Sequence, residues 1–258
     1  MGIVNITPDS FADGGRFTDA TSAIAQAEKL LREGADILDL GAESTRPGAA
    51  AVDEEAEWLR LAPVLRALRD SPVPISVDTM KPAVMRRAID AGAAMINDIC
   101  ALVEPGALAV LAASDAAVCL MHMQGEPRTM QAAPIYADVV RDVDCFLRER
   151  VAVAQAAGIA PERIVVDPGF GFGKTLEHNL HLLRHLAVLC DKSPPLLAGL
   201  SRKSSLGRIT GRPVEERLAG SLAAALIALA GGARILRVHD VAPTRDIVAV
   251  WQAVRQAY

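Results

Sequence analysis

The chain has 258 residues, of which 51% are hydrophobic and 3% aromatic, and its formal net charge is −4. This length and apolar content suit one large domain with a sizeable core. The mild negative charge, without a basic stripe, argues against a nucleic-acid partner and against a membrane surface. The longest apolar stretch, 218–233, is too short and too rich in alanine to span a bilayer, so we expect a helix buried between its neighbours.

The start of the chain and its cysteines bear on the compartment. No signal peptide is recognisable, because Met1 leads directly into an apolar run. The four cysteines are scattered without metal-binding spacing, so we expect reduced, mostly buried thiols in a cytoplasmic protein: Cys100, Cys119, Cys145 and Cys190.

Eight short apolar runs alternate with helical patterns. The runs predict strands at 2–7, 36–41, 74–79, 95–99, 117–123, 164–169, 195–201 and 234–240. The patterns predict helices near 20–34, 53–69, 82–91, 105–113, 136–157, 176–190, 214–231 and 243–257. This alternation predicts a parallel sheet with right-handed crossovers, and eight units in about 250 residues predict a closed (β/α)8 TIM barrel, one domain over 1–258. An open doubly wound sheet is the alternative, but its Gly-x-Gly turn is missing after the first strand.

A carboxylate or an amide recurs where the apolar runs end. The residues concerned are Asn5, Asp39, Asp78, Asn97 and Asp167. Polar groups are costly in a core, and at the carboxyl ends of parallel strands they are expected where the strands open onto a site. Helix capping could account for one of these residues, but hardly for Asp78, Asn97 and Asp167 together. Carboxylates beside an amide suit a flat heterocycle that is rich in hydrogen-bond donors.

Basic residues gather near the ends of the last two predicted strands. Lys203 follows the seventh strand, and Ser204 with the first N–H groups of a helix forms a cradle for a carboxylate or a phosphate. A surface basic cluster is the alternative interpretation. Arg237 and His239 are two residues apart on the eighth strand and therefore face the same side, beside Asn5 when the barrel closes. We expect an anion site there.

Three loops at the same end of the strands are longer than packing requires: 8–19, 42–52 and 123–134. Loops of this kind are commonly mobile and functional. The second loop holds Arg46 among small hydrogen-bond donors, and arginine matches the geometry of phosphate. A solvated loop arginine is the alternative for Arg46.

The string DPGFGFGK at 167–174 is the most specific in the chain. Its glycines permit a sharp turn, and Phe170 with Phe172 can form an apolar wall. It is not a nucleotide P-loop, because the spacing before Lys174 differs. His122, between two methionines, is expected in the core or lining the mouth rather than in catalysis.

Seven strings, in this order, resemble the dihydropteroate synthase family: NITPDSF, ESTRPG, SVDT, IND, DPGFGFGK, GLSRKS and RVHDV. The resemblance spans nearly the whole chain. It implies a (β/α)8 barrel and a transferase that joins para-aminobenzoate to 6-hydroxymethyl-7,8-dihydropterin diphosphate. The products are 7,8-dihydropteroate and pyrophosphate, the pathway is folate biosynthesis, and the family is the target of sulfonamides.

The resemblance also implies roles for residues that match the motifs. It implies a pterin pocket made of Asp78, Asn97, Asp167 and Lys203. It implies a pyrophosphate site, with Mg²⁺ near Asn5, made of Asn5, Arg237 and His239. It implies a mobile loop that carries Thr45, Arg46 and Pro47. It implies para-aminobenzoate contacts by Phe172 and Ser204. The residues expected to act in catalysis are Asp78, Lys203, Arg237, His239 and Arg46. A homodimer through late barrel helices, with 214–231 as a candidate surface, is implied as well.

The chemistry implied by the resemblance depends mainly on the leaving group. Because the amine of para-aminobenzoate is a weak nucleophile, stabilising the departing pyrophosphate should dominate the rate. Departure generates a cationic methylene on the pterin, which Asp78 could stabilise while Asp167 anchors the ring. This favours dissociation before attack, although direct displacement remains open.

The chain departs from the family in two places. Gly41-Ala42-Glu43 stands where the family has Gly-Gly-Glu, and family members carry residues ahead of the first strand that Met1 already adjoins here. We therefore expect a truncated chain or a misassigned start. Three alternative functions remain: a non-catalytic pterin-binding paralogue, a methyltetrahydrofolate:corrinoid methyltransferase, and a generic phosphate-sugar barrel enzyme. The second has no use for a pyrophosphate clamp, and the third does not explain the three polar strand ends.

Overall fold

The computed structural model describes residues 1–257 except 7–15, 45–50, 128 and 192–193. Thr45, Arg46 and Pro47 lie outside the described residues, as does most of the predicted loop 8–19. The described strands are β1 (Gly2–Asn5), β2 (Leu38–Gly41), β3 (Ile75–Asp78), β4 (Met95–Asp98), β5 (Ala117–Met121), β6 (Ile164–Asp167), β7 (Leu197–Ala198) and β8 (Ile235–Leu236).

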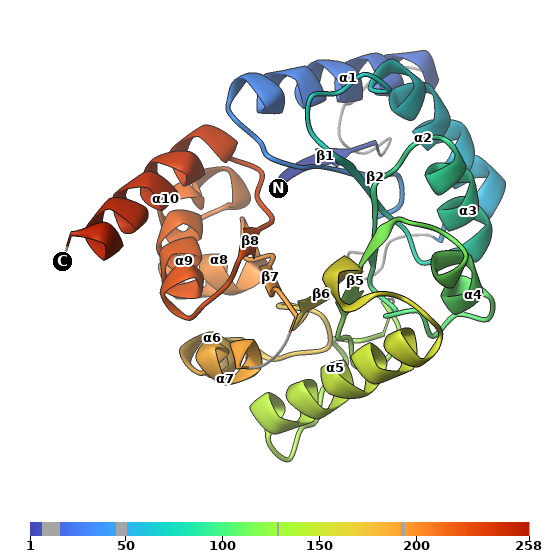
Figure 1. The fold of residues 1–258 in the computed structure, drawn as a ribbon. Helices are drawn as coiled ribbons and strands as arrows, with labels where there is room; N and C mark the ends of the chain where they lie inside the picture. The colour runs from blue at the N-terminus through green and yellow to red at the C-terminus, as the bar shows by residue number, and fades with distance from the viewer. Residues whose placement is uncertain (7–15, 45–50, 128, 192–193, 258) are drawn as a thin grey trace.

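The strands form a closed ring. β1 to β6 pair in parallel in chain order, and β7 pairs in parallel with β8. Single bridges join the two sheets, between Val166 and Leu196 on one side and between Gly2 and Val238 on the other. On the second side the amide of Ile3 donates to the Val238 carbonyl at 3.0 Å. Figure 1 shows the ring of strands enclosed by helices, which confirms the predicted (β/α)8 barrel over the open sheet.

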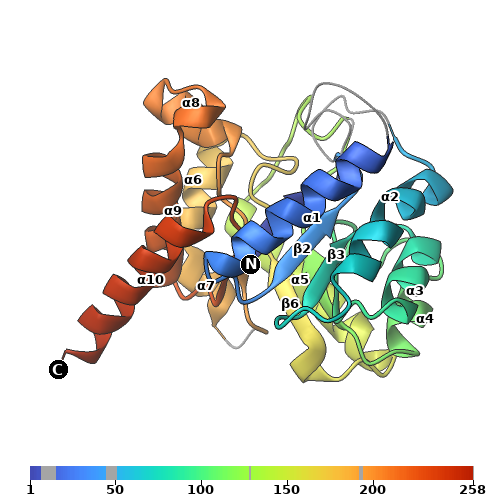
Figure 2. The same cartoon turned by 90° about the horizontal axis from the view of Figure 1, so that it is seen from above.

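The helices around the ring are α1 (Arg16–Arg32), α2 (Glu54–Ala67), α3 (Pro82–Asp90), α4 (Ala107–Ala112), α5 (Val139–Ala156), α6 (Leu176–Arg184), α7 (Leu186–Cys190), α8 (Ser204–Thr210), α9 (Leu218–Ala230) and α10 (Val241–Gln256). The backbone of 16–19 is helical rather than part of a loop. The helix predicted at 176–190 is divided at His185, where the backbone leaves the helical region. Figure 2 shows α8 at one end of the molecule, beyond α6 and α9.

Local signals fix several helix ends. The side chain of Asp53 accepts a hydrogen bond from the amide of Ala56, so it caps α2, and three acidic residues follow in the first turn. Proline occupies the first position of α3, where its missing N–H costs nothing. These signals place α2 and α3 directly after the segments that leave β2 and β3.

The core has two parts. The larger part lies between the strands and the surrounding helices, and includes fully buried side chains such as Leu30, Leu40, Val77 and Ile96. Burying each such side chain stabilises the fold by about 1.5–3 kcal/mol. The smaller part is an apolar layer inside the ring, made of Met1, Met95, Cys119, Val165 and Leu197.

The apolar layer inside the ring explains where the polar strand ends point. Residues two apart on a strand face the same side. Asn97 follows Met95 by two residues, and Asp167 follows Val165 in the same way, so both project into the ring one layer above the apolar floor. The floor closes one end of the barrel, and the polar layer opens toward the other.

The structure bears on three expectations from composition, and it changes two of them, those for the cysteines and for the apolar stretch at 218–233. Among the described residues, no helix combines the length and apolarity needed to cross a membrane. The cysteines are free, and Cys119 is buried, but Cys145 is exposed. α9 buries one face and exposes Leu226 and Ile227 on another, so it is covered on one side only by the barrel.

Candidate active site

A guanidinium lies between two carboxylates at the level of the polar layer. Nε of Arg237 donates to Oδ2 of Asp39 at 2.6 Å, and Nη2 of Arg237 donates to Oδ2 of Asp78 at 2.7 Å. Asp39 is fully buried, and the side chain of Arg237 is 20% exposed. Asn97 also reaches Asp39, through Nδ2 at 3.3 Å. Buried charges need such partners, because an unpaired one costs several kcal/mol.

Burial and pairing shift the pKa values of Asp78 and Arg237 in this group. Burial raises the pKa of Asp78, against the lowering effect of Arg237 and with a further raising effect of Asp39. Burial by itself would lower the pKa of Arg237, but Asp39 and Asp78 hold it above its ordinary value. Arg237 therefore stays charged, and Asp78 takes up a proton more readily than an exposed carboxyl.

Unpaired polar atoms line the same interior. Within the described residues, Oδ1 of Asp39 and Oγ of Ser76 are buried without a hydrogen-bond partner. The two residues are register partners on β2 and β3. Such atoms are rare in folded proteins and are commonly satisfied by water or a ligand. The interior of the ring beneath Arg237 is therefore equipped to bind something polar.

A second group forms around Asp167. Its Oδ1 accepts a hydrogen bond from the amide of Gly169 at 2.7 Å. Burial raises its pKa, opposed by that hydrogen bond and then by Lys203. The ammonium of Lys203 stands 4.4 Å from the ring centre of Phe172, a cation–π distance. A carboxylate, an ammonium and an aromatic face thus meet beside the polar layer.

Lys174 lies beneath this group. It is 3% exposed, and its Nζ lies 2.9 Å from Nδ1 of His122 and 3.0 Å from the carbonyls of both Gly169 and Phe172. Burial lowers the pKa of Lys174 to about 7. Burial, with Lys174, lowers the pKa of His122 to about 3. His122 is thus buried, which agrees with the expected core or mouth-lining position, and the ammonium of Lys174 bonds to carbonyls of its own loop.

His239 is oriented by a neighbouring hydroxyl. Its Nδ1 lies 3.0 Å from Oγ of Ser201, and its amide donates to the same oxygen at 3.2 Å. Burial, together with Arg202 and Arg237, lowers its pKa to about 4. Arg202 forms a bidentate ion pair with Asp240, in which Nε lies 2.9 Å from Oδ2 and Nη2 lies 2.5 Å from Oδ1. His239 is therefore a neutral imidazole at neutral pH in a strongly basic neighbourhood.

The structure brings some predicted residues together and separates others. Asp78 is the register partner of Asn97. Asn5 lies exposed at the end of β1, and Ser204 lies exposed at the start of α8. Among the described residues, Arg237 does not donate to Asn5, because its guanidinium is taken by the two buried carboxylates. Arg237 and His239 follow the same strand but bond to different neighbours.

Sequence reasoning left two contributors out of the site. Asp39 belongs to the set of polar strand ends, and that position was the available signal for its contact with Arg237. Lys174 gave no signal beyond its place in the glycine-rich string. Its burial depends on the fold of the loop around it.

Comparison with known proteins defines the class first. A family model described as "Pterin binding enzyme" matches residues 1–239. Together with the closed barrel and its polar layer, this match makes the chain a pterin-binding barrel enzyme. The dihydropteroate synthase of Haemophilus influenzae is 52% identical over 258 residues, which cover 100% of this chain and 94% of that protein. That of Escherichia coli is 50% identical, with 100% and 92% covered.

Solved structures agree. The Yersinia pestis dihydropteroate synthase with a sulfonamide drug complex superposes with a TM-score of 0.94 at 48% identity, covering 100% of this chain and 94% of that one. The Burkholderia cenocepacia dihydropteroate synthase complexed with 7,8-dihydropteroate gives 0.90 at 49% identity, covering 100% and 91%. The chain therefore belongs to the dihydropteroate synthase family, whose members are transferases.

Proposed function

We propose that this protein condenses 6-hydroxymethyl-7,8-dihydropterin diphosphate with para-aminobenzoate, giving 7,8-dihydropteroate and pyrophosphate in folate biosynthesis. The observation that carries the proposal is the polar layer above the apolar floor, with Asp78, Asn97 and Asp167 on three strands of one ring. Structures of two relatives, 49% and 54% identical to this chain, have been solved with 7,8-dihydropteroate and with 4-aminobenzoic acid, respectively.

The pterin half of the site is assigned to the buried groups. Asp167 accepts N–H groups of the ring, and Asn97 can both donate and accept. Lys203, whose ammonium lies over the ring of Phe172, offers its N–H groups to ring acceptors. The carboxylate of Asp78 is assigned to stabilise the positive charge that would develop on the pterin methylene, and its place opposite Asn97 supports this role.

The anion half is assigned to Asn5 at the end of β1 and to Arg237 and His239, which follow β8. Arg237 and the loop residue Arg46 would neutralise the departing pyrophosphate, and His239, as a neutral imidazole, would contribute a hydrogen bond to it. The C–O bond to pyrophosphate breaks, the nitrogen of para-aminobenzoate bonds to the methylene carbon, and the new amine loses its proton. An arriving diphosphate would compete with Asp39 and Asp78 for Arg237, which is supported by the placement of that guanidinium between the two carboxylates.

Mg²⁺ is proposed at Asn5. The described residues contain no group of three or more His, Cys, Asp and Glu side chains that could hold a metal by themselves. Mg²⁺ commonly keeps several waters and takes one or two protein oxygens together with substrate phosphates. The exposed amide of Asn5 at the strand end fits such a partial set. When bound, the ion would supply charge neutralisation for the leaving group.

Para-aminobenzoate is assigned to Phe172 and Ser204, with Thr45 and Pro47 from the loop that the resemblance implies. Phe172 offers a ring face beside Lys203, and Ser204 is exposed at the start of α8. A sulfonamide would occupy the same contacts. These assignments make the protein a proposed sulfonamide target.

The protein is further proposed to act as a cytoplasmic homodimer. Free cysteines suit a reducing compartment. Exposed apolar side chains on the late helices support pairing of two copies. They are Leu218, Leu226 and Ile227 on α9, and Val250 and Val254 on α10.

One assay tests the proposed reaction. Pyrophosphate is measured from dihydropterin diphosphate and Mg²⁺, with and without para-aminobenzoate. We expect release that depends on para-aminobenzoate. Pterin binding without release would instead indicate a non-catalytic paralogue, and methyl transfer from methyltetrahydrofolate would indicate the corrinoid-dependent class.

A further inference from the structure

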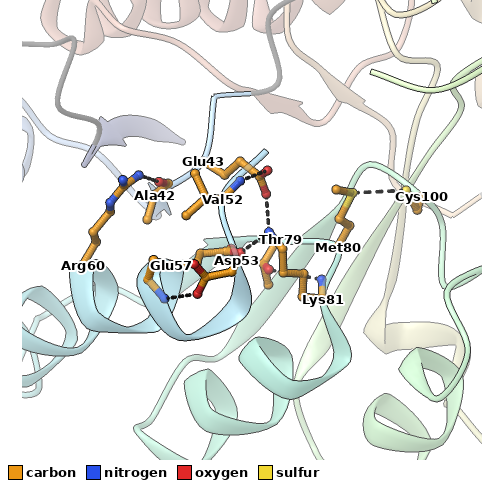
Figure 3. Close-up of polar contacts among 11 residues, drawn as sticks. Ala42, Glu43, Val52, Asp53, Glu57, Arg60, Thr79, Met80, Lys81 and Cys100 are labelled. Carbon is orange, nitrogen blue, oxygen red and sulfur yellow. Dashed lines mark hydrogen bonds and ion pairs between the residues drawn. The ribbon is translucent and has the colours of Figure 1, made fainter. Parts of the chain in front are cut away.

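Three segments of the chain meet at one ammonium group outside the polar layer (Figure 3). Nζ of Lys81, just before α3, bonds to Oε2 of Glu43, just after β2, and to Oε2 of Glu57 in α2 at 2.6 Å. The side chains of Lys81, Glu43 and Glu57 are 19%, 12% and 1% exposed. We call these three residues the Lys81 clamp.

The clamp depends on its cation. Burial raises the pKa of Glu57, and the hydrogen bond and charge of Lys81 oppose that rise. The two carboxylates in turn hold the pKa of Lys81 above its ordinary value. A carboxylate as buried as Glu57 needs a charged partner, and the described residues supply Lys81.

The clamp fixes both ends of the segment between β2 and α2. The second carboxylate oxygen of Glu43, Oε1, accepts the amide of Val52 at 2.9 Å. Nη1 of Arg60 donates to the carbonyl of Ala42 at 2.9 Å, which holds the chain just before Glu43. Asp53 caps α2 directly after Val52. Residues 43 and 52 are thus held beside each other and tied to α2 and α3 (Figure 3).

The clamp is also close to the site along the chain. Lys81 follows Asp78 by three residues, and its amide donates to Oγ1 of Thr79 at 3.3 Å. The amide of Thr79 donates in turn to the carbonyl of Asn97 at 3.2 Å. A shift of Lys81 therefore reaches the ends of β3 and β4 as well as residues 43 and 52.

We propose that Lys81 is a positioning residue for the reaction: by bridging Glu43 and Glu57 it sets where the 43–52 segment leaves β2 and where β3 ends at Asp78. This inference rests on the proposed function. Small misplacements of positioning groups can cost on the order of 10²-fold in rate. The ammonium of Lys81 is paired with Glu43 and Glu57, so its effect acts through the residues that it holds.

The test compares two variants, each of which removes a cationic side chain that pairs with a glutamate of α2. Lys81→Met breaks the clamp, and Arg87→Met breaks the exposed pair between Arg87 and Glu55, whose atoms are 2.6 Å apart. We expect Lys81→Met to lower kcat/KM for para-aminobenzoate by about 10- to 100-fold and to change the Kd of free pterin by a smaller factor, because Asp167 and Lys203 lie outside the segments that Lys81 holds. Arg87→Met should leave both constants near the wild-type values, and Lys81→Arg should recover part of the loss.

Hydrogen exchange at the Val52 amide is the readout that does not need activity. We expect faster exchange in Lys81→Met than in wild type and Arg87→Met, because Glu43 loses the group that holds it. Lys81→Met/Glu57→Gln removes the buried charge together with its partner and serves if the single variant does not fold. Unchanged exchange at Val52, or faster exchange with unchanged kcat/KM, overturns the proposal. Wild-type protein without pyrophosphate release overturns the proposed function instead.

Discussion

At the scale of single residues, charge balance in the barrel mouth depends on Arg237. Its guanidinium contacts Asp39 at 2.6 Å and Asp78 at 2.7 Å, and Asp39 is fully buried. One cation thus compensates two carboxylates from adjacent strands. Removal of the cation leaves like charges close together in a poorly solvated interior.

We predict that Arg237→Met lowers the free energy of unfolding by about 3–5 kcal/mol, since it leaves buried carboxylates without a partner. The double variant Arg237→Met/Asp39→Asn should recover part of that loss. Urea unfolding at neutral pH measures both. A loss below about 1 kcal/mol, the level of an exposed ion pair, would show that Arg237 does not compensate these carboxylates.

His239 gives a prediction about pH. Its pKa is lowered to about 4 from 6.5, first by burial and then by Arg202 and Arg237. Between these two pH values, His239 is protonated in the unfolded chain and neutral in the folded chain. The contribution of His239 to stability is therefore present above 6.5 and is lost as the pH falls toward 4. NMR titration of the imidazole should show a midpoint well below 6.5; an ordinary midpoint would contradict the burial.

At the scale of elements, the loop 168–174 is shaped by close backbone approaches. Gly169 has φ +67°, and a Cβ there would lie 1.9 Å from the His122 carbonyl oxygen. Lys174 then ties the carbonyls of Gly169 and Phe172 to one ammonium. These close contacts therefore hold the backbone of the loop that carries Phe172 in one conformation.

We predict that Gly169→Ala destabilises the protein more than Gly158→Ala. Gly158 has φ +95° with no atom within 4 Å of the added Cβ, so its cost is the conformational one of about 1–2 kcal/mol. Gly169→Ala adds a clash with backbone and should cost at least roughly twice as much. Thermal and urea unfolding of the two variants decide the matter, and equal losses would show that the loop can move away.

At the scale of the whole molecule, the proposed homodimer would bury the apolar surface of the late helices. α9 and α10 lie on one side of the barrel, and α4 lies on the opposite side (Figure 1). Ile227 on α9 is 50% exposed, and Val103, just before α4, is 59% exposed. Ile227 and Val103 are therefore both exposed aliphatic residues, but they lie on opposite sides of the barrel.

We predict that wild-type protein and Val103→Glu sediment as dimers, and that Ile227→Glu shifts the equilibrium to monomers. A charge placed in an apolar interface loses its hydration without gaining a partner, whereas one on a free surface does not. Sedimentation velocity over a range of protein concentrations measures the shift. A monomeric wild type, or a dimer that survives Ile227→Glu, would remove α9 from the interface.

The sequence determined the barrel and the general nature of its mouth. The position of Asp78, Asn97 and Asp167 at the ends of apolar runs predicts that they lie at one end of the barrel, and the structure places each at the end of its strand. The helical patterns near 53–69 and 82–91 likewise located the starts of α2 and α3 to within one residue. These inferences depend on neighbours along the chain, for which spacing is a sufficient guide.

The tertiary structure decided which partner each long side chain takes. Arg237 pairs with Asp39 and Asp78, and Lys174 bonds to a carbonyl of its own loop. Lys81 joins segments that are 24 and 38 residues away in the chain. Long side chains have many rotamers of similar energy, so their choice is set by buried charge and by the space left after packing. Those quantities exist only once distant segments have been brought together.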